Sequence, residues 1–299
     1  MVVHLTEKRW HELLWVRAGD PGAIARAYAG RRRRPALLSA KRTLFLVAAD
    51  HPARGALGVG ADPTAMADRR TLLERLLIAL ENPEVDGVLG SPDIIEELLL
   101  LDALHDKIVL GSMNRGGLAG ADWEIDDRFT GYNARSLVES RLDGGKMLLR
   151  LVDSDPGTIP TLHACADAVS ELAAHGLMAM VEPLPYRRDE SGTLRMQTDA
   201  AALQRAITVA SGLGVTSAHT WLKIPAPQDL SVLDATTLPV LLLGGAPSGD
   251  VAADLASWGG ALSHCAARGL VVGRSLLYPP DGDVARAVQA AADILKEAR

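Results

Sequence analysis

The 299-residue sequence predicts a (β/α)8 TIM barrel. Eight short, mostly apolar segments alternate with longer amphipathic segments. Continuous apolar runs of about four to eight residues are typical of parallel strands that are buried on both faces. Eight such strand–helix units within about 260 residues match the usual size of this barrel. The alternative is an open doubly wound sheet, which opens with a glycine-rich turn. No G-x-G-x-x-G pattern follows the first strand, so the barrel is favoured.

The strands are expected where leucine, valine and isoleucine gather between helical segments. The eight predicted strands are Thr43–Asp50, Asp86–Ser91, Ile108–Asn114, Lys146–Val152, Met178–Pro183, His219–Pro225, Pro239–Gly245 and Gly269–Ser275.

Start signals place the helices between these strands. Asp62 is expected to cap a helix over Pro63–Leu80, with proline at its first position. Ser91 precedes Pro92–His105 in the same way. After the sixth strand, Ala226–Leu238 leaves room for only a turn or two of helix. The remaining predicted helices are Thr158–His175, Thr198–Gly212, Gly249–Trp258 and Asp283–Arg299.

The N-terminal part stands outside the repeat. We expect residues 1–40 to form a helical extension packed on a barrel of residues 41–299, with helices over His4–Ala18 and Pro21–Arg33. The run Arg31–Arg34 can be an anion-binding patch or a solvated helix end, where cations interact favourably with the helix dipole. The second interpretation is favoured.

Composition excludes several classes of protein. The net charge of −6 argues against general nucleic-acid binding, which requires a basic face. No apolar run approaches the roughly 18 residues of a membrane-spanning helix. The two cysteines, Cys165 and Cys265, form no CxxC pattern, which indicates a reducing, cytoplasmic setting. The histidines are scattered without zinc-ligand spacing, so no metal site is expected.

Lysines within two predicted strands suggest nucleophilic chemistry. Lys223 lies in TWLKIPAP, where its amine must be desolvated or reach an open cavity. Desolvation and a nearby cation both lower a lysine pKa, and a neutral amine forms Schiff bases with carbonyls. Lys146 in KMLLRLV should point inward, in alternation with Leu148 and Arg150, and supply that cation. Alternatively, Lys223 packs its stem with its head in water, or Lys146 starts its strand at the surface.

Two carboxylates end predicted strands. Asp50 closes LFLVAAD and can move a proton to or from a substrate hydroxyl, or it is a turn residue. Glu182 closes MAMVEP and can orient the lysine or bind a hydroxyl, or it pairs with Arg150 or another cation of the barrel.

Glycine-rich turns follow the seventh and eighth strands. Barrels frequently bind phosphate with these two loops, through backbone N–H groups. Glycine alone is weak evidence, because it also makes tight turns. Arginine adds a bidentate charge, and Arg150 and Asn114 are further polar groups at strand ends. The predicted substrate- and phosphate-binding residues are Gly244, Gly245, Ser248, Gly273, Arg274, Arg150 and Asn114.

These segments together resemble the class I, Schiff-base aldolases of the DeoC/FbaB/LacD barrel group. LVAADHPARG is similar to the strand-one Asp-His signature, and WLKIP to the strand that carries the Schiff-base lysine. KMLLR and VEPLPY resemble the strand-four lysine and strand-five Glu-Pro of the tagatose-bisphosphate branch. LLLGG and VVGRS resemble the phosphate loops. The resemblance covers Leu44–Asp283 and is nearest to an actinobacterial subgroup associated with myo-inositol catabolism.

The chain also departs from this group. The archaeal fructose-bisphosphate branch has Tyr-Pro-Arg-Gly after strand five, where this chain has Glu182 and Pro183, with Tyr186 nearby. The sequence therefore does not identify the residue that acts as the proton donor. The insertion Asp122–Tyr132 matches no motif and is expected to be a lid or an interface.

The resemblance implies a cytoplasmic homo-oligomeric lyase that cleaves a phosphorylated keto sugar or keto acid through an imine on Lys223. Asp50 or Glu182 would handle the proton and Lys146 would assist. No metal or organic cofactor would be needed, and neither nucleic acid nor a membrane would be a partner. The candidate substrates are 5-dehydro-2-deoxygluconate 6-phosphate and ketose 1,6-bisphosphates. The alternative is a non-catalytic sugar-phosphate-binding barrel with a regulatory role.

Overall fold

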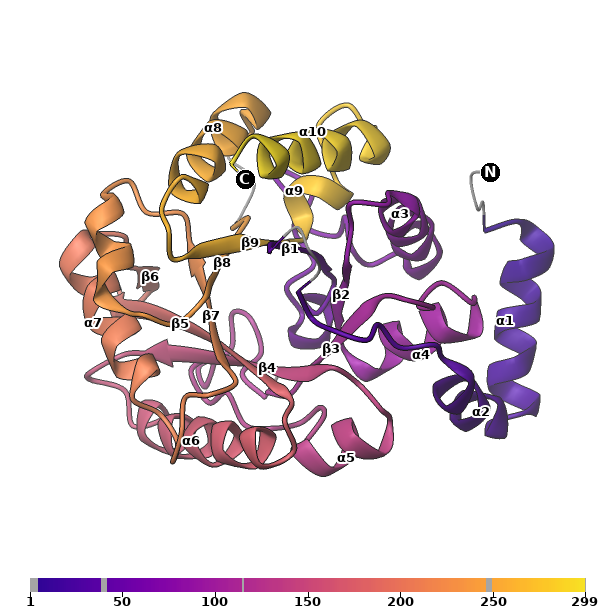
Figure 1. Cartoon of the computed structure of the whole chain (residues 1–299), viewed down its shortest axis with the longest axis horizontal. Coiled ribbons are helices and arrows are strands. Elements are labelled where there is room, and N and C mark those ends of the chain that lie inside the picture. The colour runs from indigo at the N-terminus through magenta and orange to yellow at the C-terminus, as the bar shows by residue number, and fades with distance from the viewer. Residues whose placement is uncertain (1–4, 39–41, 115, 246–248, 299) are drawn as a thin grey trace.

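A closed barrel of eight parallel strands forms the centre of the molecule (Figure 1). The computed structural model describes residues 5–38, 42–114, 116–245 and 249–298. Neighbouring strands pair in chain order around the barrel, and β9 closes it by pairing with β1. The barrel strands are β1 (Leu44–Ala48), β2 (Gly87–Gly90), β3 (Ile108–Ser112), β4 (Gly144–Leu151), β5 (Met178–Arg188), β7 (Thr220–Pro225), β8 (Val240–Leu243) and β9 (Ala267–Val272).

Helices surround this barrel, and among the described residues none is long and apolar enough to cross a bilayer (Figure 1). The segment between β7 and β8 contains only the 3₁₀ turn η2 (Leu230–Ala235), as its length predicts. The helices of the repeat are α3 (Arg69–Glu81), α4 (Pro92–Leu100), α5 (Ala134–Glu139), α6 (Thr158–Ala174), α7 (Ala200–Ser211), α8 (Val251–Leu262), α9 (Arg274–Leu277) and α10 (Val284–Glu297).

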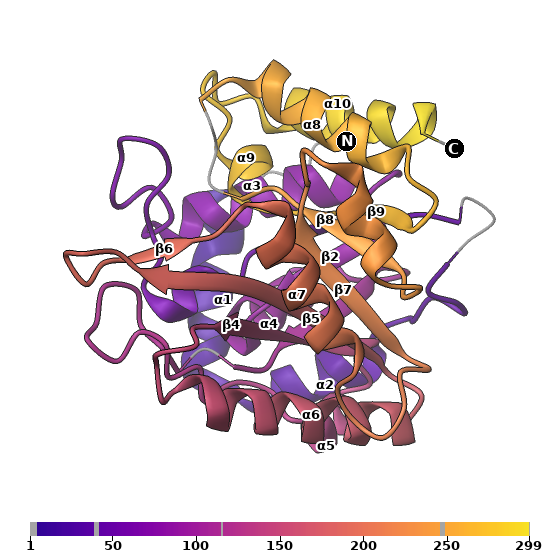
Figure 2. The same ribbon diagram turned by 90° about the vertical axis from the view of Figure 1, so that its left-hand side faces the viewer.

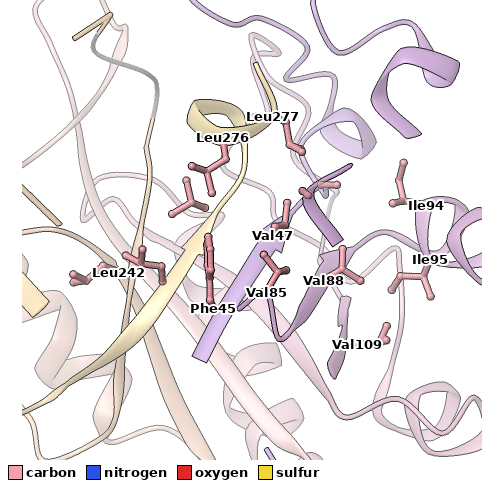
Figure 3. Packing of buried hydrophobic residues seen from close by; sticks show 14 of the residues in the cluster. Phe45, Val47, Val85, Val88, Ile94, Ile95, Val109, Leu242, Leu276 and Leu277 are labelled. Atoms are coloured by element: carbon pink, nitrogen blue, oxygen red, sulfur yellow. The ribbon is translucent and has the colours of Figure 1, made fainter. Parts of the chain in front are cut away.

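Alternation along each strand separates two apolar clusters. On β1, Leu44 and Leu46 face the barrel interior, whereas Phe45 and Val47 pack against the helices. Figure 3 shows Phe45 and Val47 in the second of these clusters, close to Leu276 of α9. Because side chains along a strand alternate with a period of two, the position of a polar residue in its strand decides whether it faces the barrel interior or the helices.

All eight predicted strands are present, although the last one ends at Val272, because Arg274 begins α9. The predicted start of the helix after β1 is wrong. The helix after β1 begins at Arg69, where Asp68 accepts a hydrogen bond from the Thr71 amide, and not at Pro63. Asp62 instead stabilises a turn by accepting from the amide and hydroxyl of Thr64. Aspartate is a favourable N-cap at either position, so the local sequence does not distinguish Asp62 from Asp68. Packing of the apolar helix face decides where the helix begins.

The sequence did not indicate a short ninth strand. β6 (Leu194–Met196) pairs antiparallel with the end of β5, so Tyr186 lies opposite Met196. Figure 2 shows this hairpin projecting beyond the barrel at the carboxyl end of β5, the same end as the long purple loop that follows β1. This end of a (β/α)8 barrel is where active sites lie.

Two further helices, α1 (Glu7–Gly19) and α2 (Gly22–Gly30), precede the barrel. They lie outside the ring of helices, and α2 packs on α4 (Figure 1). The hydroxyl of Tyr28 on α2 is hydrogen-bonded to that of Tyr132, 2.6 Å away, which connects the extension to the loop after β3.

The arginine run after α2 is not a solvated helix end. The helix ends at Gly30, and the Arg31 side chain is only 1% exposed. Asp143, directly before β4, accepts from Arg31 at 3.2 Å and from Arg33 at 3.0 Å, and also from the Val109 amide at 2.9 Å. The run therefore crosses the amino-terminal end of the barrel and ties neighbouring strands together.

We predict that Arg31→Ala lowers the free energy of unfolding by about 3–5 kcal/mol, because it leaves the buried Asp143 carboxylate without its buried partner. Urea denaturation measures this change. Arg32→Ala is the control, because Arg32 and its partner Asp106 are both more than half exposed, and it should have a far smaller effect. Equal effects of the two variants would contradict the role of the buried pair.

Candidate active site

A cavity of about 420 Å³ opens at the carboxyl end of the barrel. It takes its polar lining from the ends of five different strands and the loops that follow them. Its charged, aromatic and glycine lining residues are Asp50, His51, Arg54, Glu182, Tyr186, Lys223, Gly244, Gly245, Gly273 and Arg274.

Strand alternation explains why the two lysines and Glu182 meet. Met147 and Leu149 of β4 pack outward, so Lys146 faces the interior, as predicted. On β5 and β7, the interior positions Met180 and Trp221 precede Glu182 and Lys223 by two residues. Glu182 and Lys223 therefore also face the barrel interior, each one position closer to the carboxyl end than the apolar residue before it on that face.

The four predicted catalytic residues lie in one buried cluster. Lys223 Nζ is 2.9 Å from Glu182 Oε1, and Lys146 Nζ contacts Glu182 Oε2. Lys146 Nζ is also 3.3 Å from Asp50 Oδ2, which accepts from the Ser112 hydroxyl at 3.0 Å. All four side chains are less than 10% exposed. Glu182 pairs with these lysines and not with Arg150, the alternative partner that the sequence left open.

The two ammonium groups control the ionisation of Glu182. Burial alone would raise the pKa of this carboxyl, but the charges of Lys146 and Lys223, and hydrogen bonds from both, lower it well below its usual value. Glu182 is therefore a carboxylate at neutral pH, and it lies between the two amines.

His51 is a neutral imidazole in this setting. Burial, followed by the positive charges of Arg274 and Lys223, lowers its pKa well below the usual 6.5. Its Nδ1 lies 3.9 Å from Asp50 Oδ1, which is too long for a hydrogen bond. A neutral ring can both donate and accept a hydrogen bond at the cavity wall.

The predicted phosphate loops line the same cavity. Arg274 reaches the carbonyl oxygens of Gly58 and Gly245, at 3.5 and 3.4 Å. A Cβ at position 273 would lie 2.4 Å from the carbonyl oxygen of Ala48, so packing against β1 by itself requires this glycine. Predicted residue Ser248 lies outside the described residues.

Two other predicted binding residues have protein partners. Arg150 donates to both carboxylate oxygens of Asp127, at 2.7 and 2.8 Å, and to Glu124 at 2.9 Å. The Asn114 side chain exchanges two hydrogen bonds with the backbone of Leu148, at 2.6 and 2.7 Å. Neither residue lines the cavity. Arg150 connects β4 to the loop after β3, and the Asn114 side chain connects the end of β3 to β4.

Sequence reasoning missed Arg54 and Met196 in the cavity wall. Arg54 ends the 3₁₀ turn η1 (Pro52–Arg54), directly after β1. Its place in the first strand-to-helix loop is a signal that a survey of whole loops, rather than strand ends, would have found. Met196 reaches the cavity only because β6 pairs with β5, and no local pattern announces that hairpin.

A family model described as Cgl0159-like matches residues 42–292. The chain belongs to this family. The crystal structure of Cgl0159 from Corynebacterium glutamicum is 48% identical, with a TM-score of 0.94, and the match covers 98% of each chain. No curated protein sequence matches this Cgl0159-like chain.

More distant structures share the barrel. An archaeal fructose 1,6-bisphosphate aldolase is 17% identical, with a TM-score of 0.68 over 92% of this chain and 99% of that one. A Schiff-base-forming fructose-1,6-bisphosphate aldolase is 16% identical, with a TM-score of 0.66 over 91% and 99%. At such identity the likeness extends to the fold of this Cgl0159-like chain and no further.

We predict that His51 stays neutral as the pH falls through 6.5, because protonation would add a buried cation near Arg274 and Lys223. Histidine-detected NMR measures this pKa. Unfolded chains take up the proton near pH 6.5, so this group lowers stability as the pH falls below that value. Arg274→Gln should raise the pKa, whereas Arg128→Gln, on an exposed loop position, should not. A titration near 6.5 in the unaltered protein would contradict the assignment.

Proposed function

We propose that this protein is a class I aldolase that reversibly cleaves a phosphorylated keto sugar or keto acid through an imine on Lys223. The observation that carries the proposal is the buried row of amine, carboxylate and amine formed by Lys223, Glu182 and Lys146, of which Lys223 and Glu182 line the cavity. An amine beside a base, in a site that excludes most water, is the arrangement that imine chemistry requires. The aldolases that share the barrel agree with this proposal.

The geometry supports a route for the first protons. Lys223 gives a proton to Glu182 across the 2.9 Å contact and attacks the substrate carbonyl as a neutral amine. The carbinolamine then forms, and its hydroxyl leaves as water when Glu182 returns a proton to it. Lys146, which contacts both Glu182 and Asp50, keeps a positive charge beside these carboxylates during the exchange.

The protonated imine is the electron sink for carbon–carbon cleavage. The substrate hydroxyl loses its proton to a carboxylate, its oxygen forms the aldehyde carbonyl, and the electron pair of the broken bond moves into an enamine. We assign this proton to Asp50, because Glu182 already serves the nitrogen and the carbinolamine oxygen. Asp50 lies within 3.3 Å of Lys146, so its charge is compensated in the cluster.

The glycine loops and Arg274 complete the proposed site by binding phosphate. Gly244, Gly245 and Gly273 bring backbone close to the cavity, and the Arg274 guanidinium lies among them. A substrate with a phosphate beside its ketone can then place its carbonyl toward Lys223. Among such substrates we propose 5-dehydro-2-deoxygluconate 6-phosphate, with fructose 1,6-bisphosphate and tagatose 1,6-bisphosphate as alternatives.

Borohydride trapping tests the imine. With a keto sugar phosphate and borohydride, the intact protein should gain the mass of one reduced adduct, measured by mass spectrometry. Lys223→Met should abolish both trapping and turnover, because it removes the nucleophile. A panel of the three substrates, run with and without EDTA, also tests whether turnover is independent of metal.

Lys146→Met is the matched control for Lys223→Met, since it also removes a buried ammonium group that contacts Glu182. It should slow trapping without abolishing it. Trapping that survives in Lys223→Met and vanishes in Lys146→Met would mean that the nucleophile is Lys146. Phosphate-ester binding with no trapping of any panel member would instead support the non-catalytic, regulatory barrel.

Arg274→Ala should raise KM for a phosphorylated substrate by about ten- to a hundredfold and leave the unphosphorylated analogue nearly unchanged, because a charge-assisted contact contributes about 1.5–3 kcal/mol. Steady-state kinetics on the two substrates measure the difference. A purely structural role for Arg274 would require a carboxylate partner nearby, such as Asp281 or Asp283. Asp281 instead pairs with Arg286, and Asp283 caps α10. Equal losses on both substrates would remove Arg274 from phosphate binding.

A further inference from the structure

Two arginines share the cavity wall, and the proposed phosphate site uses only one of them. Arg54 and Arg274 both line the cavity, and the Nε of each is buried without a hydrogen-bond partner among the described residues. Burial and the neighbouring charge of Arg54 lower the pKa of Arg274, so the two guanidiniums are close enough to repel each other. Both remain charged, because arginine is not deprotonated in proteins.

The carboxylates near Arg54 do not balance the positive charge. Arg54 Nη2 donates to Glu124 Oε1 at 2.8 Å, but the same oxygen accepts from Arg150 at 2.9 Å. Asp127 is engaged with Arg150 through both of its oxygens. Among residues 42–114, 116–245 and 249–298, three arginines therefore face two carboxylates in this part of the site, and the hydrogen bonds of Arg274 go to carbonyl oxygens. A buried excess of positive charge of this kind favours an anion.

The two neighbouring guanidiniums have different partners around the barrel mouth. Around the barrel, β3 and β8 each lie two strands from β1, in opposite directions. Arg274 reaches the carbonyls of Gly245, just after β8, and of Gly58, in the loop after β1, whereas Arg54 reaches Glu124 in the loop after β3. If the glycine loops and Arg274 bind one acidic group of a ligand, Arg54 can contact a different part of the same ligand.

We propose that Arg54 binds a second acidic group of the substrate, a phosphate or a carboxylate, at the end remote from the phosphate held by Arg274. The proposal rests on the proposed function for the phosphate at Arg274. Arg54 thereby selects substrates with two acidic groups. Glu124 accepts a hydrogen bond from the Arg54 guanidinium and competes with that group.

Binding of polyols tests this without any catalysis, because compounds that lack a carbonyl form no imine. Glucitol 6-phosphate and 6-phosphogluconate differ only in a carboxylate at the first carbon. Mannitol 1-phosphate and mannitol 1,6-bisphosphate differ only in the second phosphate. Calorimetry on the full-length protein should show about tenfold or tighter binding of the diacid in at least one pair. The pair that shows the preference identifies the second group as carboxylate or phosphate.

Arg54→Gln should remove this preference and change the Kd of the monoacids by less than about threefold. Glu124→Gln keeps the size of the side chain and leaves Arg150 paired with Asp127, so it should tighten binding of the diacid by removing the competitor. Arg128→Gln is the matched control. It removes an exposed arginine from the same loop, paired with Asp126, and should change neither Kd.

Three results would overturn the proposal. The first is equal affinity within both pairs, or no binding of any of the four polyols by the unaltered protein. The second is an equal loss for monoacid and diacid in Arg54→Gln, which would mean that Arg54 only shapes the loop. The third is a Glu124→Gln variant that weakens diacid binding as Arg54→Gln does. Failure of borohydride trapping would count against the imine mechanism alone and would leave these binding results intact.

Discussion

Two lysine side chains can be buried in the same barrel because Glu182 lies between them. An isolated ammonium group is very costly to remove from water, and two neighbouring ones also repel. Glu182 contacts both amines, and Asp50 contacts Lys146 from the other side. The cluster is thereby close to neutral as a whole, although each member is charged. Asp50, Glu182 and Lys223 of this cluster line the cavity.

The cluster depends on the barrel for its geometry. Four residues from β1, β4, β5 and β7 or their ends meet only because the sheet closes on itself through β9. Interior rows of Leu, Met and Trp fill the barrel beneath them, so the polar side chains have no room to turn away. A buried polar network of this kind is stable only when all of its members have partners.

Ion pairs close the two ends of the barrel in different ways. At the amino-terminal end, Arg31 and Arg33 converge on Asp143, and Arg34 pairs with Asp86, so each of these carboxylates anchors the start of a strand. At the carboxyl end, Arg150 is fully engaged by Asp127 and Glu124. Asp143 is shared by two arginines at the amino-terminal end, and Glu124 is shared by Arg54 and Arg150 at the carboxyl end. The two ends differ in position, because Asp143 lies at the start of a strand, whereas Arg54 lines the cavity at the carboxyl end.

The sequence by itself determined the strand order, the inward direction of Lys146 and the buried position of Lys223, because apolar runs and period-two alternation are local properties of the chain. It could not decide that Arg150 and Asn114 are used by the protein itself, since their partners Asp127 and Leu148 are set by packing of the loop after β3. It also assigned the Arg31–Arg34 run to solvent, because nothing local shows that Asp143, more than one hundred residues later, lies beside it. Only closure of the barrel brings these charges together. An ion pair depends on the distance between two charges in space. The sequence patterns used for the predictions depend only on residues that are close together along the chain.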